Sequence, residues 1–166
     1  MGKILKIVII VVALLTIGFL VRPPVTGGRL SSLWGIRFTG ESILHAGSDI
    51  AHSIGTPINP AIMGRIRETG YDDQRGNYIR IAHAGIIESR YYHLDSININ
   101  NGDTVNHSSI IGTVGNTGYS TGPHLHYEIR LFGIPLPPFL LSLPGMIFKY
   151  LPTKIEFPNI EIPANL

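Results

Sequence analysis

Two short patterns of histidine and aspartate could together hold a metal ion. His45 and Asp49 form an H-x-x-x-D pattern, and His124 and His126 form an H-x-H pattern late in the chain. Imidazole nitrogens and carboxylate oxygens are common zinc ligands, and three protein ligands leave one position open, as in catalytic zinc sites. His45, Asp49 and one histidine of the later pair would make such a set. The remaining histidines could then transfer protons or stabilise a transition state.

The later pair lies in an alternating segment, His124 to Ile129, which predicts a β-strand. Residues i and i+2 of a strand project from the same face, so the two imidazoles would lie side by side, with Cα atoms roughly 6.6 Å apart. Leu125 and Tyr127 would face the other way. An isolated H-x-H can equally be a pair of structural histidines, and its spacing does not show which ring would bind metal.

The earlier pair needs a bent backbone. On a straight strand, His45 and Asp49 would be separated by roughly 13 Å, too far for both side chains to reach one ion. Gly47 lies between them and permits a bend. We therefore expect this pattern to bind metal only if the segment is curved or looped.

A third candidate imidazole ends another predicted strand. Alternation over the segment from Ile86 to Leu94 places His93 on the same face as Ile87, Ser89 and Tyr91. The other histidines lie in turns or at strand ends, and we predict that they are surface residues: His52, His83 and His107.

The pattern from Trp34 onward predicts an all-β domain, a small antiparallel barrel or sandwich. Short apolar segments alternate with Gly, Pro and Asn, and no helical period appears there. Ala84-Gly85 is a predicted turn, and Asn101-Gly102 is a strong signal for a two-residue hairpin. Strands are predicted within these ranges: 58–66, 78–83, 86–94, 110–114 and 124–129.

The two ends of the chain differ from this domain. Lys3 and Lys6 precede an uncharged apolar run, so residues 1–21 are predicted to be a signal-anchor transmembrane helix, with a cleaved signal peptide as the alternative. The positive-inside rule then places the domain outside the cytoplasm. Residues 22–33, rich in Pro, Gly and Ser, are a predicted linker. Residues 131–166 are a predicted Pro-rich apolar tail, which packs on the domain or contacts a membrane surface.

Composition excludes several classes of function. The chain of 166 residues has no cysteine, so it has neither a disulfide scaffold nor thiolate ligands nor a cysteine nucleophile. The net charge of +2 comes without a cluster of Lys or Arg, so no nucleic-acid partner is expected. Such a weak positive charge is compatible with an acidic polymer such as a cell wall.

Six motifs in order resemble the lysostaphin/LytM-type zinc peptidases, from about Trp34 to Glu128. They are G-I-R at 35–37, H-A-G-S-D-I-A at 45–51, G-T-P at 55–57, G-N-Y-I-R-I-A-H at 76–83, Y-Y-H-L at 91–94 and G-N-T-G-Y-S-T-G-P-H-L-H-Y-E at 115–128. The resemblance implies a zinc peptidase domain over residues 34–130, an antiparallel β core with a groove, and hydrolysis of peptide bonds in peptidoglycan.

The resemblance also assigns roles to residues. It implies that one zinc ion per chain is bound by His45, Asp49 and His126, and that His93 and His124 are catalytic, although it does not say which is the general base. Tyr92 and Tyr119 are candidate substrate contacts.

Three functions remain open at this point. The first is a membrane-anchored peptidoglycan endopeptidase on the outer side of the cytoplasmic membrane. The second is a non-catalytic wall-binding scaffold, or an activator of another wall hydrolase; the five intact positions favour the enzyme. The third is a component of a secretion, conjugation, phage or division apparatus that opens the wall locally.

Overall fold

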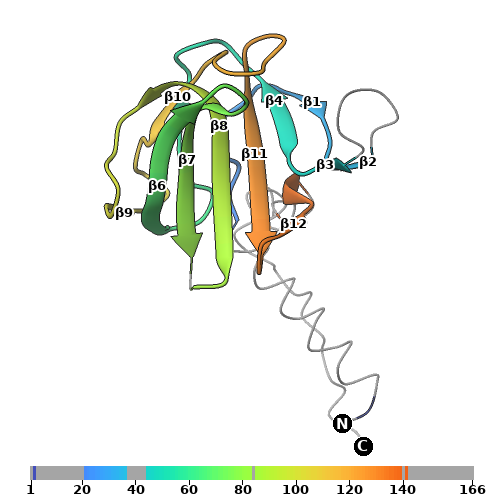
Figure 1. The fold of residues 1–166 in the computed structure, drawn as a ribbon, viewed down its shortest axis with the longest axis vertical. Coiled ribbons are helices and arrows are strands. Elements are labelled where there is room, and N and C mark those ends of the chain that lie inside the picture. Colours follow the sequence, from blue (N-terminus) through green and yellow to red (C-terminus); the bar gives the residue numbers. More distant parts are fainter. Residues whose placement is uncertain (1, 3–20, 37–43, 84, 140, 142–166) are drawn as a thin grey trace, which may run out of the picture.

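The computed structural model describes residues 2, 21–36, 44–83, 85–139 and 141 (Figure 1). The elements named over these residues are all β-strands, which confirms the prediction of an antiparallel all-β domain. The strands are β1 Arg29–Ser32, β2 Gly35–Ile36, β3 Leu44–His45, β4 Ser48–Ala51, β5 Pro57–Ile58, β6 Gly64–Asp72, β7 Gly76–His83, β8 Ile87–Ile97, β9 Thr104–Val105, β10 Gly112–Val114, β11 His124–Leu131 and β12 Ile134–Leu136.

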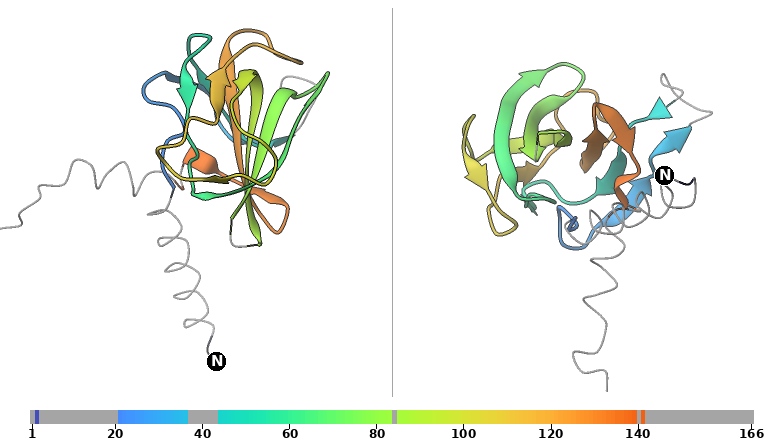
Figure 2. Two further views of the ribbon diagram at one scale, coloured as in Figure 1. Left: turned by 90° about the vertical axis from the view of Figure 1, so that its left-hand side faces the viewer. Right: turned by 90° about the horizontal axis from the view of Figure 1, so that it is seen from below.

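The main sheet has ten strands, and its principal order is β1-β4-β11-β8-β7-β6-β9. β12 pairs with β11, and β10 joins β8 to β5, while β2 and β3 form a separate two-stranded sheet. Seen from below, the sheet curves around the interior of the domain (Figure 2). The central strands β7, β8 and β11 therefore have one face toward the core and one face away from it.

Alternation along the central strands separates the core from a polar face. Ile79 and Ile81 of β7, Tyr91 of β8, and Leu125 and Ile129 of β11 are all fully buried in one apolar cluster. Burying such a side chain contributes about 1.5–3 kcal/mol. The intervening residues of the same strands form the opposite, polar face. The strand predicted at 124–129 is confirmed, with its histidines on this polar face.

The predicted linker is wrong, because residues 22–33 are part of the domain. Val25 is buried in the core, as is Val21 just before this segment. The backbone N–H of Arg22 donates to the carbonyl of Ala61, and β1 pairs with β4. The two valines supply apolar area that a free linker would leave in water, and β4 offers an open edge for pairing.

The predicted tail also begins too early. Ile134–Leu136 forms β12 and pairs with β11, and Pro138 and Leu141 are buried. The domain therefore extends beyond residue 130, and residues 142–166 lie outside the described part of the chain. Residues 1 and 3–20 of the N-terminal helix predicted over residues 1–21 also lie outside it. Among the described residues, no helix is long and apolar enough to span a membrane.

Of the two predicted turns, only the first closes a hairpin. β7 and β8 pair as neighbours across the turn that contains Gly85, whose φ is +77°. At Asn101-Gly102 a tight turn does form, with Gly102 at φ +91°, but the hairpin prediction is wrong. β9 follows that turn and pairs with β6, because β8 already bonds to β7, β11 and β10.

Candidate metal centre

His45, Asp49 and His126 bring three ligand atoms to one point. His45 Nε2 lies 3.1 Å from Asp49 Oδ1 and 3.2 Å from His126 Nδ1, and His126 Nδ1 lies 2.8 Å from Asp49 Oδ1. His45 and His126 are 7% and 9% exposed, so the atoms meet in a largely buried place. The described residues contain this one group of three potential metal ligands.

Strand pairing explains the convergence. His45 ends β3 and Asp49 lies in β4, and the break at Ala46-Gly47 supplies the bend that the H-x-x-x-D pattern needed. β4 then pairs with β11 so that Asp49 lies directly opposite His126. The bend is also tight: a Cβ on Gly47 would lie 2.5 Å from the Tyr127 carbonyl oxygen and 2.7 Å from His126 Nε2. Glycine at position 47 lets the two segments approach this closely.

Contacts behind the two rings determine where their protons lie. His45 Nδ1 lies 2.7 Å from the carbonyl oxygen of Leu33, which can only accept, so Nδ1 carries the hydrogen and Nε2 keeps its lone pair. His126 Nε2 lies 3.2 Å from Glu128 Oε1, which places the hydrogen on Nε2 and leaves a lone pair on Nδ1. With the Asp49 carboxylate, three lone pairs converge, and this arrangement needs a positive charge among them.

The triangle of ligand atoms fits zinc. For zinc bonds of about 2.0–2.1 Å in a tetrahedron, neighbouring ligand atoms are about 3.3 Å apart. The three observed separations, 2.8–3.2 Å, lie close to that value. Two neutral imidazoles and one carboxylate are the donor set of many catalytic zinc sites.

Electrostatics agree with a cation site. Burial disfavours a charged Asp49, but the neighbouring rings of His126 and His45 outweigh it and hold the pKa of the carboxyl well below its usual value. Burial likewise disfavours a charged His126, yet Asp49 and Glu128 on its two sides raise its pKa. For Glu128, hydrogen bonds with His126 and Arg130 overcome burial and lower the pKa to about 2. The surroundings of the three ligand atoms are therefore negative.

His93 and His124 lie beside the three ligands. Their ring centroids are 4.7 Å apart, and the His93 ring is 6.1 Å from that of His126. His124 Nε2 lies 3.9 Å from Asp49 Oδ1. The structure thus brings all five sequence-predicted metal and catalytic residues together.

Simple alternation gives the wrong face for His93. Ile87 and Tyr91 pack in or against the core, whereas the His93 ring lies on the opposite, polar face near His124. His93 has φ +66°, and the β7–β8 register shifts beside it, between Asn77 and Ile79. A bulge therefore reverses the direction of the side chain, as bulges near active sites often do.

Both of these rings present a free nitrogen to the site. His93 Nδ1 donates to the Thr117 carbonyl at 2.9 Å, and His124 Nδ1 donates to the Gly122 carbonyl at 2.7 Å. Their Nε2 atoms are consequently unprotonated when the rings are neutral. Burial, only partly offset by the hydrogen bond to Thr117, lowers the pKa of His93 to about 4, so this ring is neutral at neutral pH. Each ring can then accept a proton.

A groove of about 580 Å³ opens beside the ligands. Its lining includes Arg29 and Ser31 of β1, Asp49 of β4, and the segment from Thr121 to His124, where β11 begins. A peptide in this groove would lie against both the metal site and His124.

The two predicted substrate contacts lie in different surroundings. Tyr119 is 65% exposed on a loop. Tyr92 is buried, and its ring is nearly parallel to that of His126, with centroids 5.3 Å apart. Tyr92 packs a ligand ring in place, and contact of either tyrosine with substrate stays a prediction.

The sequence interpretation missed two features of this region. Glu128, on the same strand face as His126, bonds to the ligand ring, and the alternation of β11 could have indicated it. His83 is 4% exposed, so its prediction as a surface residue is wrong. Its ring forms hydrogen bonds with the Met63 carbonyl and with the hydroxyl of Ser89, which is fully buried. His52 and His107 are partly buried.

The chain resembles known proteins in its sequence. The sequence profile of "Peptidase family M23" matches residues 43–138, more than half of the chain. The chain is 37% identical over 127 residues to the peptidoglycan DD-endopeptidase ShyC of Vibrio cholerae, covering 74% of this chain. It spans only 29% of the length of that relative.

Solved structures share the fold. The catalytic domain of the antimicrobial peptidase lysostaphin from Staphylococcus simulans superposes with a TM-score of 0.66 at 31% identity, over 70% of this chain and 92% of that domain. A zinc-containing peptidase from Vibrio cholerae superposes with a TM-score of 0.59 at 32% identity, over 71% of this chain and 36% of the other.

Proposed function

The chain belongs to peptidase family M23, and we propose that it is a zinc-dependent endopeptidase that hydrolyses peptide bonds in peptidoglycan. The observation that carries this proposal is the meeting of three ligand lone pairs, from His45, Asp49 and His126, beside two further imidazoles with free Nε2 atoms. A family member that had lost its activity would be expected to lack part of this set.

Zinc at this site would supply Lewis-acid chemistry, polarising a carbonyl and making water more acidic. The chain's own residues supply the rest. The groove beside β1 and β4 holds an extended peptide so that its scissile carbonyl reaches the site. His93 and His124, with unprotonated Nε2 atoms, can accept the proton of the attacking water. Once protonated, the same rings can donate to the oxyanion or to the leaving amine.

The substrate class is supported by relatives and by composition. ShyC is named a peptidoglycan DD-endopeptidase, and residues 43–138, which match the family profile, include every proposed catalytic position. The groove is open and lined mainly by polar residues and glycine, which suits a polar peptide attached to a polymer. Peptidoglycan is therefore the proposed partner.

The proposed location is the outer side of the cytoplasmic membrane, with one N-terminal membrane span. The support is the sequence pattern of Lys3 and Lys6 ahead of an uncharged apolar run. N-terminal sequencing of the protein in the membrane fraction would recover Met1 or Gly2 if the span is retained. A start near residues 22–30 would contradict it.

Digestion of purified sacculi tests the activity. The purified full-length chain should create new amino termini in the peptides of the sacculi and leave the glycan chains unchanged. A chelator should stop the reaction, and added zinc should restore it. Cleavage of glycan without peptide cleavage, or digestion that a chelator leaves untouched, would contradict the proposal. A sample that binds zinc but never cuts would favour the scaffold or activator function instead.

A further inference from the structure

We propose that Glu128 is a positioning residue for the metal site, which selects the metal-binding tautomer of His126 and fixes the orientation of its ring. This inference rests on the proposed zinc site and adds a residue to it. Glu128 lies two residues after His126 on β11, so the two side chains project from the same face. Its Oε1 lies 3.2 Å from His126 Nε2, the nitrogen that faces away from Asp49.

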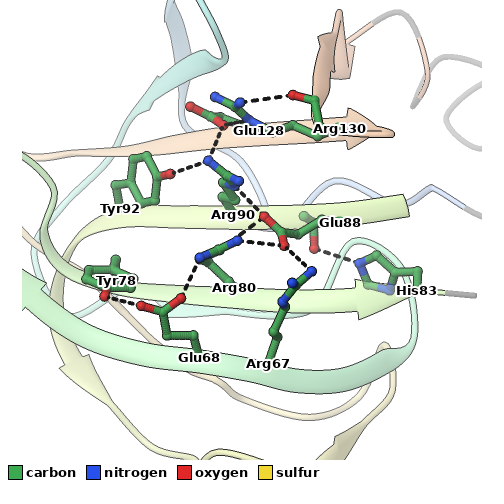
Figure 3. Close-up of polar contacts among 12 residues, drawn as sticks. Arg67, Glu68, Tyr78, Arg80, His83, Glu88, Arg90, Tyr92, Glu128 and Arg130 are labelled. Carbon is green, nitrogen blue, oxygen red and sulfur yellow. Dashed lines mark hydrogen bonds and ion pairs between the residues drawn. The ribbon is translucent and has the colours of Figure 1, made fainter. Parts of the chain in front are cut away.

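Glu128 is itself held in place from behind. It is 4% exposed, and its other oxygen, Oε2, accepts a hydrogen bond of 2.6 Å from Arg130 Nε. Arg90, directly opposite on β8, places its Nη1 atom 3.9 Å from the same oxygen (Figure 3). One oxygen of the carboxylate therefore serves two guanidinium groups, and the other serves the ligand ring.

This arrangement determines what His126 can do. A carboxylate at Nε2 requires a hydrogen on that nitrogen, which leaves the lone pair on Nδ1 for a metal. Without Glu128, the buried Nε2–H would lose its acceptor, which is unfavourable for a donor that water cannot reach. The other tautomer would then compete, and a ring rotated about its χ2 angle would no longer point Nδ1 toward Asp49.

Arg90 links the two supports of the same ring. Its Nη1 atom lies 3.5 Å from the hydroxyl of Tyr92, whose ring stacks on His126. Arg90 Nε also bonds to Glu88, so the position of Arg90 is fixed from its own strand. The His126 ring is thus held on its edge by Glu128 and on its face by Tyr92.

Glu88 provides a matched control on the same sheet face. It is 8% exposed, it lies on the neighbouring strand, and its carboxylate bonds to Arg80, Arg90 and Arg67. No contact joins Glu88 to His45, Asp49 or His126 among the described side chains. Removing Glu88 takes one bond from Arg90 but leaves the direct contacts of His126 with Glu128 and Tyr92, so the metal ligands should stay in place.

The test is zinc affinity of the purified full-length chain, measured by competition with a chelating dye. Changing a group that bonds to a metal ligand typically lowers metal affinity 10–100-fold. We expect that loss for Glu128→Ala, and a smaller loss for Glu128→Gln, because the amide oxygen can still accept from Nε2. Glu88→Ala should bind zinc within about threefold of wild type while losing thermal stability. Cobalt substituted for zinc should show an altered visible absorption in both Glu128 variants and an unaltered one in Glu88→Ala.

Several results would overturn the inference. Zinc affinity within threefold of wild type in both Glu128 variants would do so, as would an equal loss in Glu128→Ala and Glu88→Ala. If Glu128→Ala does not fold, Glu128→Gln decides alone, with folding checked by circular dichroism. A wild-type chain that binds no zinc would overturn the proposed function as well. Wild-type binding with unchanged Glu128 variants overturns only the role of Glu128.

Discussion

Two ends of one polar sheet face accommodate buried polar groups in opposite ways. The buried carboxylate of Glu88 meets Arg80 of the neighbouring strand and Arg90 of its own strand, so opposite charges complement one another within the protein (Figure 3). Around His126, the nearest atoms are alike: two imidazole lone pairs and a carboxylate oxygen face one another. The first region is complete by itself, and the second needs a cation.

The difference shows where to search for function on such a surface. The ion pairs around Glu88 already balance their charges. They join Arg80 to Glu68 and Glu88, and Arg90 to Glu88. At the histidine end, hydrogen bonds fix the outer nitrogens of the rings, and the inner nitrogens face the Asp49 carboxylate and one another. Burying two imidazole lone pairs beside a carboxylate oxygen is unfavourable unless a cation binds between them. This requirement for a cation marks the site.

Removing a ligand should give the largest effect and should separate the two regions most clearly. His126→Ala is expected to lose bound zinc and all measurable hydrolysis of sacculi, because two protein ligands hold zinc poorly. Glu88→Ala, at the other end of the face, should keep both. Zinc content by elemental analysis and hydrolysis rate on the same folded samples give the comparison. Full activity in His126→Ala would contradict the ligand assignment.

The catalytic histidines should separate activity from metal binding. His93→Ala and His124→Ala should keep most of the zinc and lose about 10²–10⁴ in rate, because each removes a proton acceptor or a transition-state donor. The double variant should be little worse than either single one, since residues that act as a unit are not additive. If His124→Ala loses zinc and His126→Ala retains it, the two roles are reversed.

A smaller change can strain the backbone near the metal ligands without affecting the region around Glu88. Gly47→Ala should weaken zinc binding and destabilise the domain by about 1–3 kcal/mol, because the new Cβ meets the Tyr127 carbonyl and His126 Nε2 at 2.5 and 2.7 Å. Gly122→Ala is the control for stability, since a Cβ there meets nothing within 4 Å. Thermal melts with and without zinc measure both effects. An unchanged Tm in Gly47→Ala would show that the neighbouring strands can move apart.

The smallest expected effect is a dependence of stability on pH from a buried histidine outside both regions. Burial lowers the pKa of His83 below its ordinary value, despite the hydrogen bond with Met63. The unfolded chain then binds a proton that the folded chain does not, so the contribution of His83 is full above about pH 6.5 and declines as the pH falls below it. Between pH 7.5 and 5.5, the wild type should lose more Tm than His83→Gln. Parallel curves would exclude this contribution.

The sequence predicted the strands that carry the site better than their connections. Alternation identified β7, β8 and β11, and it placed Leu125 and Tyr127 on the face opposite the two histidines, which is the face that packs in the core, because burial on one face imposes a period of two. It could not reveal that Val21 and Val25 pack into the same core, since a Pro- and Gly-rich segment gives no periodic signal. Nor could it show that β9 pairs with β6, which depends on which edges are already occupied.

Within the site, residue types were predictable and orientations were not. The family pattern distinguished His126 from His124, and Gly47 indicated the bend before β4. The protonation of each ring depends on atoms distant in the sequence, such as the Leu33 carbonyl behind His45 and the Thr117 carbonyl behind His93. Only the folded chain brings those carbonyls into place.

The residue at position 93, whose φ is +66°, changes which residues of β8 face the polar side of the sheet. Before it, even-numbered residues such as Glu88 and Arg90 point to the polar face; at it, an odd-numbered residue takes that face. Which side chain reaches the site therefore depends on the number of residues that precede it in the strand, and not only on the presence of a histidine. Deleting one residue between Arg90 and His93 would bring a different side chain to the site even if every other contact formed. In the family motif Y-Y-H-L, the number of residues therefore matters as well as their types. Homologous chains should tolerate substitutions there more readily than insertions.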